Sequence, residues 1–141
     1  MKVVELMRTH IVTISPNATV ADAVDIMDLY QLTSIPVVDS DGYPLGAIDD
    51  LAISEFVFGS SSLVQGGNPA NPRANAAKMR KISELMRSPS EAVDQNADVE
   101  LAANTMTSNG LMRIPVTTEG KVTGTLSRID ICQAILEGQI S

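Results

Sequence analysis

The chain has 141 residues, of which 44% are hydrophobic, so it can bury a proper core within one compact domain. Its net charge of −7 and its lack of a basic tract argue against nucleic-acid binding, because such proteins neutralise phosphates with clustered lysine and arginine. With a single cysteine and no apolar run long enough for a membrane span or a signal peptide, we expect a cytoplasmic protein without membrane contact.

Five elements are predicted in the first 58 residues, in the order β-α-β-β-α. Thr19 has the side chain of an N-cap, and the apolar residues after it follow helical spacing. Asp41-Gly42 is typical of a tight hairpin turn between two β-prone runs. In chain order we expect a strand over 11–14, a helix over 20–31, strands over 35–38 and 45–48, and a helix over 50–58.

Residues 59–80 are predicted to be a flexible connector between the two halves. Glycine and proline are dense between Gly59 and Asn75, and both residue types break periodic structure. A lid or a partner-docking segment over 59–75 is the alternative, because long structureless insertions are often functional.

The second half, over 81–138, predicts the same order of elements. Asp98 can cap a helix, Glu119-Gly120 favours a turn, and Gly138 is a usual residue just after a helix end. We expect a weak strand at 92–93, a helix over 99–109, strands over 114–116 and 122–126, and a final helix over 128–137.

The two halves also repeat each other in sequence. Residues 5–8 (Glu-Leu-Met-Arg) return as residues 84–87, and residues 35–37 (Ile-Pro-Val) return as 114–116, each 79 positions later. One residue is then dropped in a turn, so that Gly46 returns 78 positions on. Because turns tolerate a length change and strands do not, this pattern predicts a duplicated α/β module whose halves pack with pseudo-twofold symmetry.

No catalytic constellation is evident. The chain has one histidine, His10, and none of the common hydrolase, phosphate-loop or metal-site motifs. The adjacent acids Asp49 and Asp50 favour helix capping over a metal site. Cys132 lies within the last predicted helix and is expected to be a small buried apolar residue. We therefore expect neither a metal site nor enzyme activity.

Ser127 and Asp130 form the one candidate site, at the point where the last strand ends and the last helix begins. Their spacing is that of a capping box, which is the first interpretation. The second is that a hydroxyl and a carboxylate at a helix start grip a vicinal diol, while the helix end binds a neighbouring phosphate. Spacing alone leaves both interpretations open.

The duplication, the S-P-N-A entry to the first helix, the paired I-P-V strands and the final G-T-L-S-R-I-D together resemble the CBS domain, found in tandem as a Bateman module. The resemblance covers about residues 3–58 and 81–136. It implies a regulatory, energy-sensing module without activity of its own. It also implies disc-shaped homodimers that bind AMP, ADP, ATP or S-adenosylmethionine in clefts between the halves.

By position, the resemblance places the family's ribose-binding hydroxyl and carboxylate on Ser127 and Asp130. Arg113 and Arg128 become candidate phosphate cations, with ordinary surface arginines as the alternative. The full set of implied ligand-binding residues is Ile11, Val12, Thr33, Ser34, Arg113, Thr125, Ser127, Arg128 and Asp130. In the first half the matching positions are Asp49 and Ala52, which puts a second site in doubt, since acids there would repel a polyphosphate.

Three hypotheses follow. The leading one is a ligand-sensing regulatory module that binds one adenosine derivative per chain and signals to an effector protein. The second is a ligand-free dimerisation or adaptor module acting through the 59–75 loop. The third is a weak enzyme or redox partner acting through Cys132.

Overall fold

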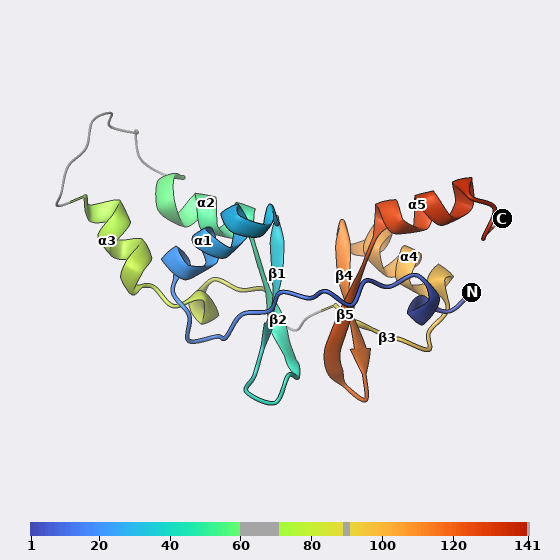
Figure 1. Ribbon diagram of the computed structural model, residues 1–141. Helices are drawn as coiled ribbons and strands as arrows, with labels where there is room; N and C mark the ends of the chain where they lie inside the picture. Colours follow the sequence, from blue (N-terminus) through green and yellow to red (C-terminus); the bar gives the residue numbers. More distant parts are fainter. Residues whose placement is uncertain (60–70, 89–90, 141) are drawn as a thin grey trace. The chain divides into compact units, whose positions relative to one another are not determined.

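The computed structural model describes residues 1–59, 71–88 and 91–140 (Figure 1). The chain folds into two compact units that do not follow its two sequence halves. Unit 1 comprises residues 1–12, 40–44 and 89–141, and unit 2 comprises residues 13–39 and 45–88. Residues 1–12, at the start of the first half, therefore belong to unit 1 with most of the second half. Residues 81–88, at the start of the second half, belong to unit 2 with most of the first half.

Unit 2 contains a two-stranded sheet, β1-β2, together with α-helices. Its core includes Ile35, Val37 and Ile48, all fully buried. The elements in chain order are α1 (Val20–Tyr30), β1 (Ser34–Val38), β2 (Pro44–Asp49), α2 (Asp50–Phe58), α3 (Pro72–Met79) and the short 3-10 helix η2 (Ile82–Glu84). The predicted helices over 20–31 and 50–58 are confirmed as α1 and α2.

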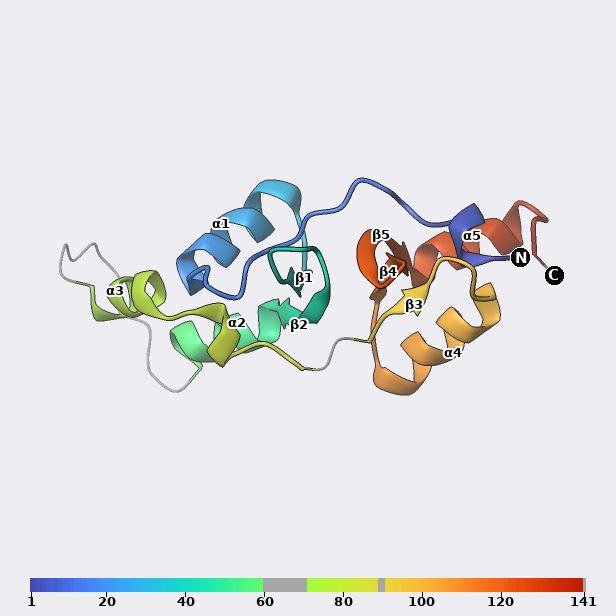
Figure 2. The same ribbon diagram turned by 90° about the horizontal axis from the view of Figure 1, so that it is seen from below.

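Unit 1 contains a three-stranded sheet in the order β3-β4-β5, with β3 parallel and β5 antiparallel to β4. Helices α4 and α5 cover the same face of this sheet (Figure 1 and Figure 2). The elements are η1 (Val3–Glu5), β3 (Val93–Asp94), α4 (Val99–Asn109), β4 (Arg113–Thr118), β5 (Lys121–Ser127) and α5 (Arg128–Leu136). Buried Met106, Ile114 and Leu126 belong to the core between sheet and helices.

The predicted strand over 11–14 is wrong except at its last residue. Ile14 alone forms a parallel bridge, to Val37, with Ile14 N–H donating to the Pro36 carbonyl at 3.1 Å. The chain passes from unit 1 to unit 2 between residues 12 and 13, so the run cannot stay on one sheet edge. In the second half the equivalent pairing, Val93 with Val116, extends to the short strand β3.

The predicted connector over 59–80 is corrected in its second part. Residues 60–70 lie outside the described residues, but 72–79 form helix α3, which packs against α1 and α2. Asn71 caps this helix by accepting hydrogen bonds from the backbone N–H groups of Arg73 and Ala74, and Pro72 occupies its first turn. Proline is tolerated there because its missing N–H would lack a helical partner anyway.

Each opening segment runs antiparallel to a strand of its unit. Arg8 exchanges backbone hydrogen bonds of 2.8 and 2.9 Å with Thr125 on β5, and Arg87 exchanges bonds of 2.8 and 3.0 Å with Ala47 on β2. A Cβ atom on the neighbouring Gly124 would come within 2.7 Å of the Arg8 carbonyl oxygen, and one on Gly46 within 2.0 Å of that of Arg87. The repeated glycine is therefore required by close backbone approach.

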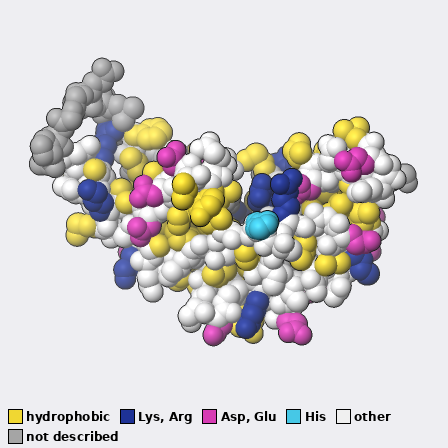
Figure 3. Space-filling model, viewed as in Figure 1, with side chains coloured by type: hydrophobic (Ala, Val, Ile, Leu, Met, Phe, Trp, Pro, Cys, Tyr) yellow, Lys and Arg dark blue, Asp and Glu magenta, His cyan; other side chains and the backbone are white. Residues whose placement is uncertain are grey.

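Helices in the described part of the chain are all too short or too polar to cross a membrane. Several helices expose large hydrophobic side chains, which are seen as yellow patches in Figure 3. The exposed large hydrophobic residues include Leu51 and Phe58 on α2, with 64% and 48% of their surface exposed, and Ile129 and Leu136 on α5, with 70% and 81% exposed. Cys132 on α5 is exposed as well, so the expectation that it is buried is wrong.

Candidate functional site

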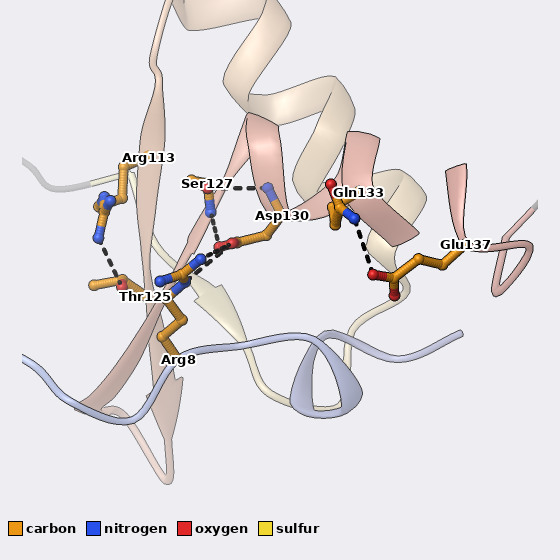
Figure 4. A network of polar contacts seen from close by, with 7 residues as sticks. All are labelled: Arg8, Arg113, Thr125, Ser127, Asp130, Gln133 and Glu137. Atoms are coloured by element: carbon orange, nitrogen blue, oxygen red, sulfur yellow. Dashed lines mark hydrogen bonds and ion pairs between the residues drawn. The ribbon is translucent and has the colours of Figure 1, made fainter. Parts of the chain in front are cut away.

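Ser127 and Asp130 form a reciprocal hydrogen-bonded pair at the start of α5 (Figure 4). The Ser127 side-chain oxygen accepts from the Asp130 backbone N–H at 3.1 Å, and the Ser127 backbone N–H donates to Asp130 Oδ2 at 3.0 Å. This is the capping box predicted from the spacing of the two residues. It holds the Asp130 carboxylate in one orientation, with Oδ1 left to face other groups.

Oδ1 of Asp130 is paired with Arg8, which the sequence-based site prediction missed. Arg8 Nε donates to Oδ1 at 3.0 Å, and Arg8 Nη2 lies 2.9 Å from the same oxygen. Figure 4 shows the Arg8 side chain reaching Asp130 from the N-terminal segment. The Asp130 side chain is 9% exposed, whereas that of Arg8 is 65% exposed. The acid is thus held in place, and the cation remains largely in water.

The pKa of the Asp130 carboxyl is lowered from its ordinary value of 3.8. Burial is the largest single influence and acts in the opposite direction, because it disfavours the charged form. The hydrogen bond from the Ser127 backbone, the contacts with the Arg8 guanidinium and the Ser127 side chain, and the charge of Arg8 together outweigh it. Asp130 is consequently ionised at neutral pH and acts only as a hydrogen-bond acceptor.

Two more predicted site residues meet on neighbouring strands of the same sheet. Arg113 Nη1 donates to the Thr125 side-chain oxygen at 3.4 Å, from β4 to β5. Thr125 is only 6% exposed, and the bond from Arg113 gives its nearly buried hydroxyl a partner. Arg128 is exposed on the first turn of α5, and its Nε donates to the Leu111 carbonyl oxygen. Its guanidinium therefore already has a protein partner.

The remaining predicted residues divide between the units. Ile11 and Val12 are half-buried in the irregular segment of unit 1 that follows Arg8. Thr33 and Ser34 belong to unit 2, at the start of β1, and the Thr33 carbonyl accepts from the Asp50 N–H at 2.9 Å. That these four residues contribute to one ligand site with Ser127 stays a prediction.

A groove of about 460 Å³ adjoins the Arg8–Asp130 pair within unit 1. Along α5, Gln133 Nε2 donates to Glu137 Oε1 at 2.9 Å, as Figure 4 shows. The residues that line the groove are Leu6, Arg8, Ile129, Asp130, Gln133, Ala134, Glu137 and Gln139. Its volume falls in the range of small-molecule sites.

The matching position in unit 2 has a different chemistry. Asp49 is the N-cap of α2, and its Oδ1 accepts from the Ala52 N–H at 2.9 Å. Arg87 Nε lies 3.5 Å from Asp49 Oδ2. Asp49 therefore makes both the helix cap, which Ser127 makes in unit 1, and the contact with arginine, which Asp130 makes there. The Ala52 side chain offers no further acceptor. The described residues contain no cluster of three groups that could hold a metal ion.

The signal that could have identified Arg8 lies in the repeat. Arg8 and Arg87 end the duplicated Glu-Leu-Met-Arg segments, and each pairs with the acid at the start of a helix in its own unit. A charged residue kept at the same place in both copies marks a shared structural role. Only the exchange of the opening segments between the units reveals its partner.

Comparison with known proteins identifies the family. The family model described as CBS domain matches residues 3–59 and again residues 82–137. This chain belongs to the CBS-domain family. It carries two CBS motifs, which confirms the resemblance predicted from the repeat and the α/β fold with a sheet and helices in each half.

Solved structures of CBS pairs have the same fold. CBSX2 from Arabidopsis thaliana, solved in complex with AMP, superposes with a TM-score of 0.77 at 20% identity, over 99% of this chain and 98% of that chain. The CBS domain pair of protein MJ0100, in complex with methylthioadenosine and S-adenosyl-L-methionine, gives a TM-score of 0.75 at 18% identity, over 99% and 98% of the two chains. At these identities the likeness establishes the fold.

A relative by sequence is the uncharacterized protein MJ1404 of Methanocaldococcus jannaschii. It is 24% identical to this CBS pair over 136 residues, or 96% of the chain. The chain spans only 32% of the length of that relative. The match therefore covers one part of a longer protein.

Proposed function

We propose that this CBS pair is a ligand-sensing regulatory module that binds an adenosine derivative at Ser127 and Asp130 and has no catalytic activity of its own. The observation that carries the proposal is the preformed network at the start of α5, in which a nearly buried carboxylate is kept ionised and oriented. Support comes from the family and from two CBS-pair structures, one with AMP and one with methylthioadenosine and S-adenosyl-L-methionine.

The chemistry of the network suits a ribose. An ionised carboxylate accepts hydrogen bonds from neighbouring hydroxyls, and bonds of this charge-assisted kind are roughly twice as strong as neutral ones. The Ser127–Asp130 bonds keep the carboxylate oriented, so little ordering remains to be done when a diol binds. AMP, ADP, ATP and S-adenosylmethionine all carry this diol and are the candidate ligands.

We further propose that the module works in the cytoplasm as a homodimer and signals to an effector protein. A regulator must couple ligand binding to its interaction with the effector. This coupling requires that the contacts with the effector differ between the ligand-free and the ligand-bound state. The exposed hydrophobic side chains of α2 and α5 offer surface for such contacts.

A thermal-shift screen against AMP, ADP, ATP and S-adenosylmethionine tests the proposal, because a ligand of the native state raises Tm by mass action. Calorimetry then compares the wild type with Asp130→Ala and the closer mimic Asp130→Asn. We expect Asp130→Ala to weaken binding by about 1.5–3 kcal/mol, the range for a hydrogen bond to a charged group. Asp49→Asn in unit 2 is the matched control, since asparagine caps a helix as well as aspartate.

Equal affinities of wild type and both Asp130 variants would mean that the network is only a helix cap. Failure of every ligand to raise Tm would instead favour the ligand-free adaptor, acting through the 59–75 loop. Most of that loop, residues 60–70, lies outside the described residues.

A further inference from the structure

We propose that Arg8 is a specificity-determining residue that makes the Ser127/Asp130 site prefer phosphorylated adenosine compounds over unphosphorylated ones. The inference rests on the proposed function. It starts from the contact between Arg8 and Asp130, in which two guanidinium nitrogens lie 3.0 and 2.9 Å from a single carboxylate oxygen. A bound ribose has to compete with this contact.

The competition follows from the acceptors that Asp130 has left. Oδ2 already accepts from the Ser127 backbone N–H, and Oδ1 is engaged by the Nε and Nη2 groups of Arg8. A vicinal diol brings two further donors to the same carboxylate. Because the Ser127 bond is part of the helix cap, the guanidinium is the group that yields, so ribose binding releases the Arg8 side chain.

The released guanidinium stays close to the site. Backbone bonds to Thr125 anchor Arg8 on both sides of its α-carbon, through its N–H and its carbonyl. The side chain can therefore swing, but only around this fixed point. It lines the 460 Å³ groove, and among the residues that line the groove Arg8 alone is basic, whereas Asp130 and Glu137 are acidic.

A phosphate group on the ligand makes the displacement of Arg8 from Asp130 more favourable. When an uncharged nucleoside displaces Arg8 from Asp130, the guanidinium loses its partner and gains none. When a nucleotide displaces it, the phosphate offers a new anion that guanidinium groups bind with two parallel hydrogen bonds. Without that cation the phosphate would face the acids of the groove. Arg8 thus lowers the affinity of the site for adenosine and raises its affinity for AMP.

Calorimetric titration of the full chain with AMP and with adenosine tests this role. For Arg8→Gln we expect AMP to bind about tenfold more weakly, as for loss of a charge-assisted hydrogen bond, while adenosine binds as well as before or better. Arg8→Lys keeps the charge and should retain part of the preference for AMP. Arg87→Gln, which removes the equivalent contact to Asp49 in unit 2, should leave both affinities unchanged.

The outcomes separate the two proposals. If Arg8→Gln weakens AMP and adenosine equally, or changes neither, then Arg8 does not select for phosphate even though the site binds ligand. If the wild type binds S-adenosylmethionine but neither AMP nor adenosine, the proposed function stands and the role of Arg8 fails. If it binds none of the candidate ligands, both proposals fail. Unchanged or improved adenosine binding also shows that the variant is folded, so a loss of AMP affinity cannot be a folding defect.

Discussion

Arg87 Nε lies 3.5 Å from Asp49 Oδ2, and this contact is the counterpart of the pair formed by Arg8 and Asp130 in the other unit. The duplicated arginine has kept an acidic partner at the start of the following helix. The position of the acid differs between the two units: Asp130 is the third residue of α5, whereas Asp49 is the N-cap of α2. An ion pair is present in both units, but unit 2 has no counterpart of the Ser127 hydroxyl, and its one acid also makes the helix cap.

We expect one nucleotide per chain at saturation. Asp49 and Ala52 replace the hydroxyl and the carboxylate in unit 2, so this position has no hydroxyl, and its one acid serves as the helix cap. Titration well above the dissociation constant measures the ratio directly. A ratio near two per chain would contradict this, because it would show that Asp49 supports binding without the hydroxyl and the second acid.

The double substitution Asp49→Ser with Ala52→Asp is the matched positive control. It restores in unit 2 the hydroxyl and carboxylate of unit 1, with Arg87 already in place to pair with the new acid. We expect the ratio to rise above one per chain, toward two. A ratio that stays at one would show that further residues, and not only this pair, make the site of unit 1.

The stability of the chain should depend on pH through Asp130. Its folded-state pKa is lowered from 3.8, so its ionised form stabilises the native state above about pH 4, and that contribution is lost as the pH falls through the lowered pKa. Urea unfolding of the wild type and Asp130→Asn at several pH values measures this. The free energies of unfolding should differ at pH 7 and converge as the pH falls below about 4, through the lowered pKa of Asp130. A difference that does not change with pH would contradict the assignment.

Alanine substitution of the repeated glycines should destabilise both units. The new Cβ would lie 2.0 Å from a backbone oxygen in Gly46→Ala and 2.7 Å in Gly124→Ala, and backbone cannot move aside as a flexible side chain can. We expect losses of about 1–3 kcal/mol or more, larger for Gly46, by denaturant unfolding. Gly110→Ala is the control, because its Cβ meets nothing within 4 Å and costs only the left-handed backbone, about 1 kcal/mol.

We expect the chain to form a homodimer at micromolar concentration. Leu51, Phe58, Ile129 and Leu136 expose 48–81% of their surface, and such apolar patches mark interaction surfaces. Twofold symmetry is the commonest arrangement for soluble oligomers. Light scattering gives the mass, and Leu136→Lys should weaken the association if α5 takes part. A monomer mass for the wild type would rule the prediction out.

Local sequence determined the regular elements of this protein. The capping residues Thr19 and Ser127 and the periodic apolar residues after them predicted α1 and α5 to within a residue, because caps and helical spacing act over one or two turns. The capping box at Ser127 and Asp130 could be read for the same reason. The repeat and its motifs then predicted the family, and the two matches of the CBS family model confirm it.

Tertiary structure alone decided which segments join which unit. The segment that ends at Arg8 pairs with β5, and the one that ends at Arg87 pairs with β2, through hydrogen bonds between residues far apart in sequence. No local pattern predicts such pairing, because the residues of a β-prone segment do not specify which strand it will pair with. For that reason the sequence predicted a strand over 11–14 that is not formed, and missed Arg8 as the partner of Asp130.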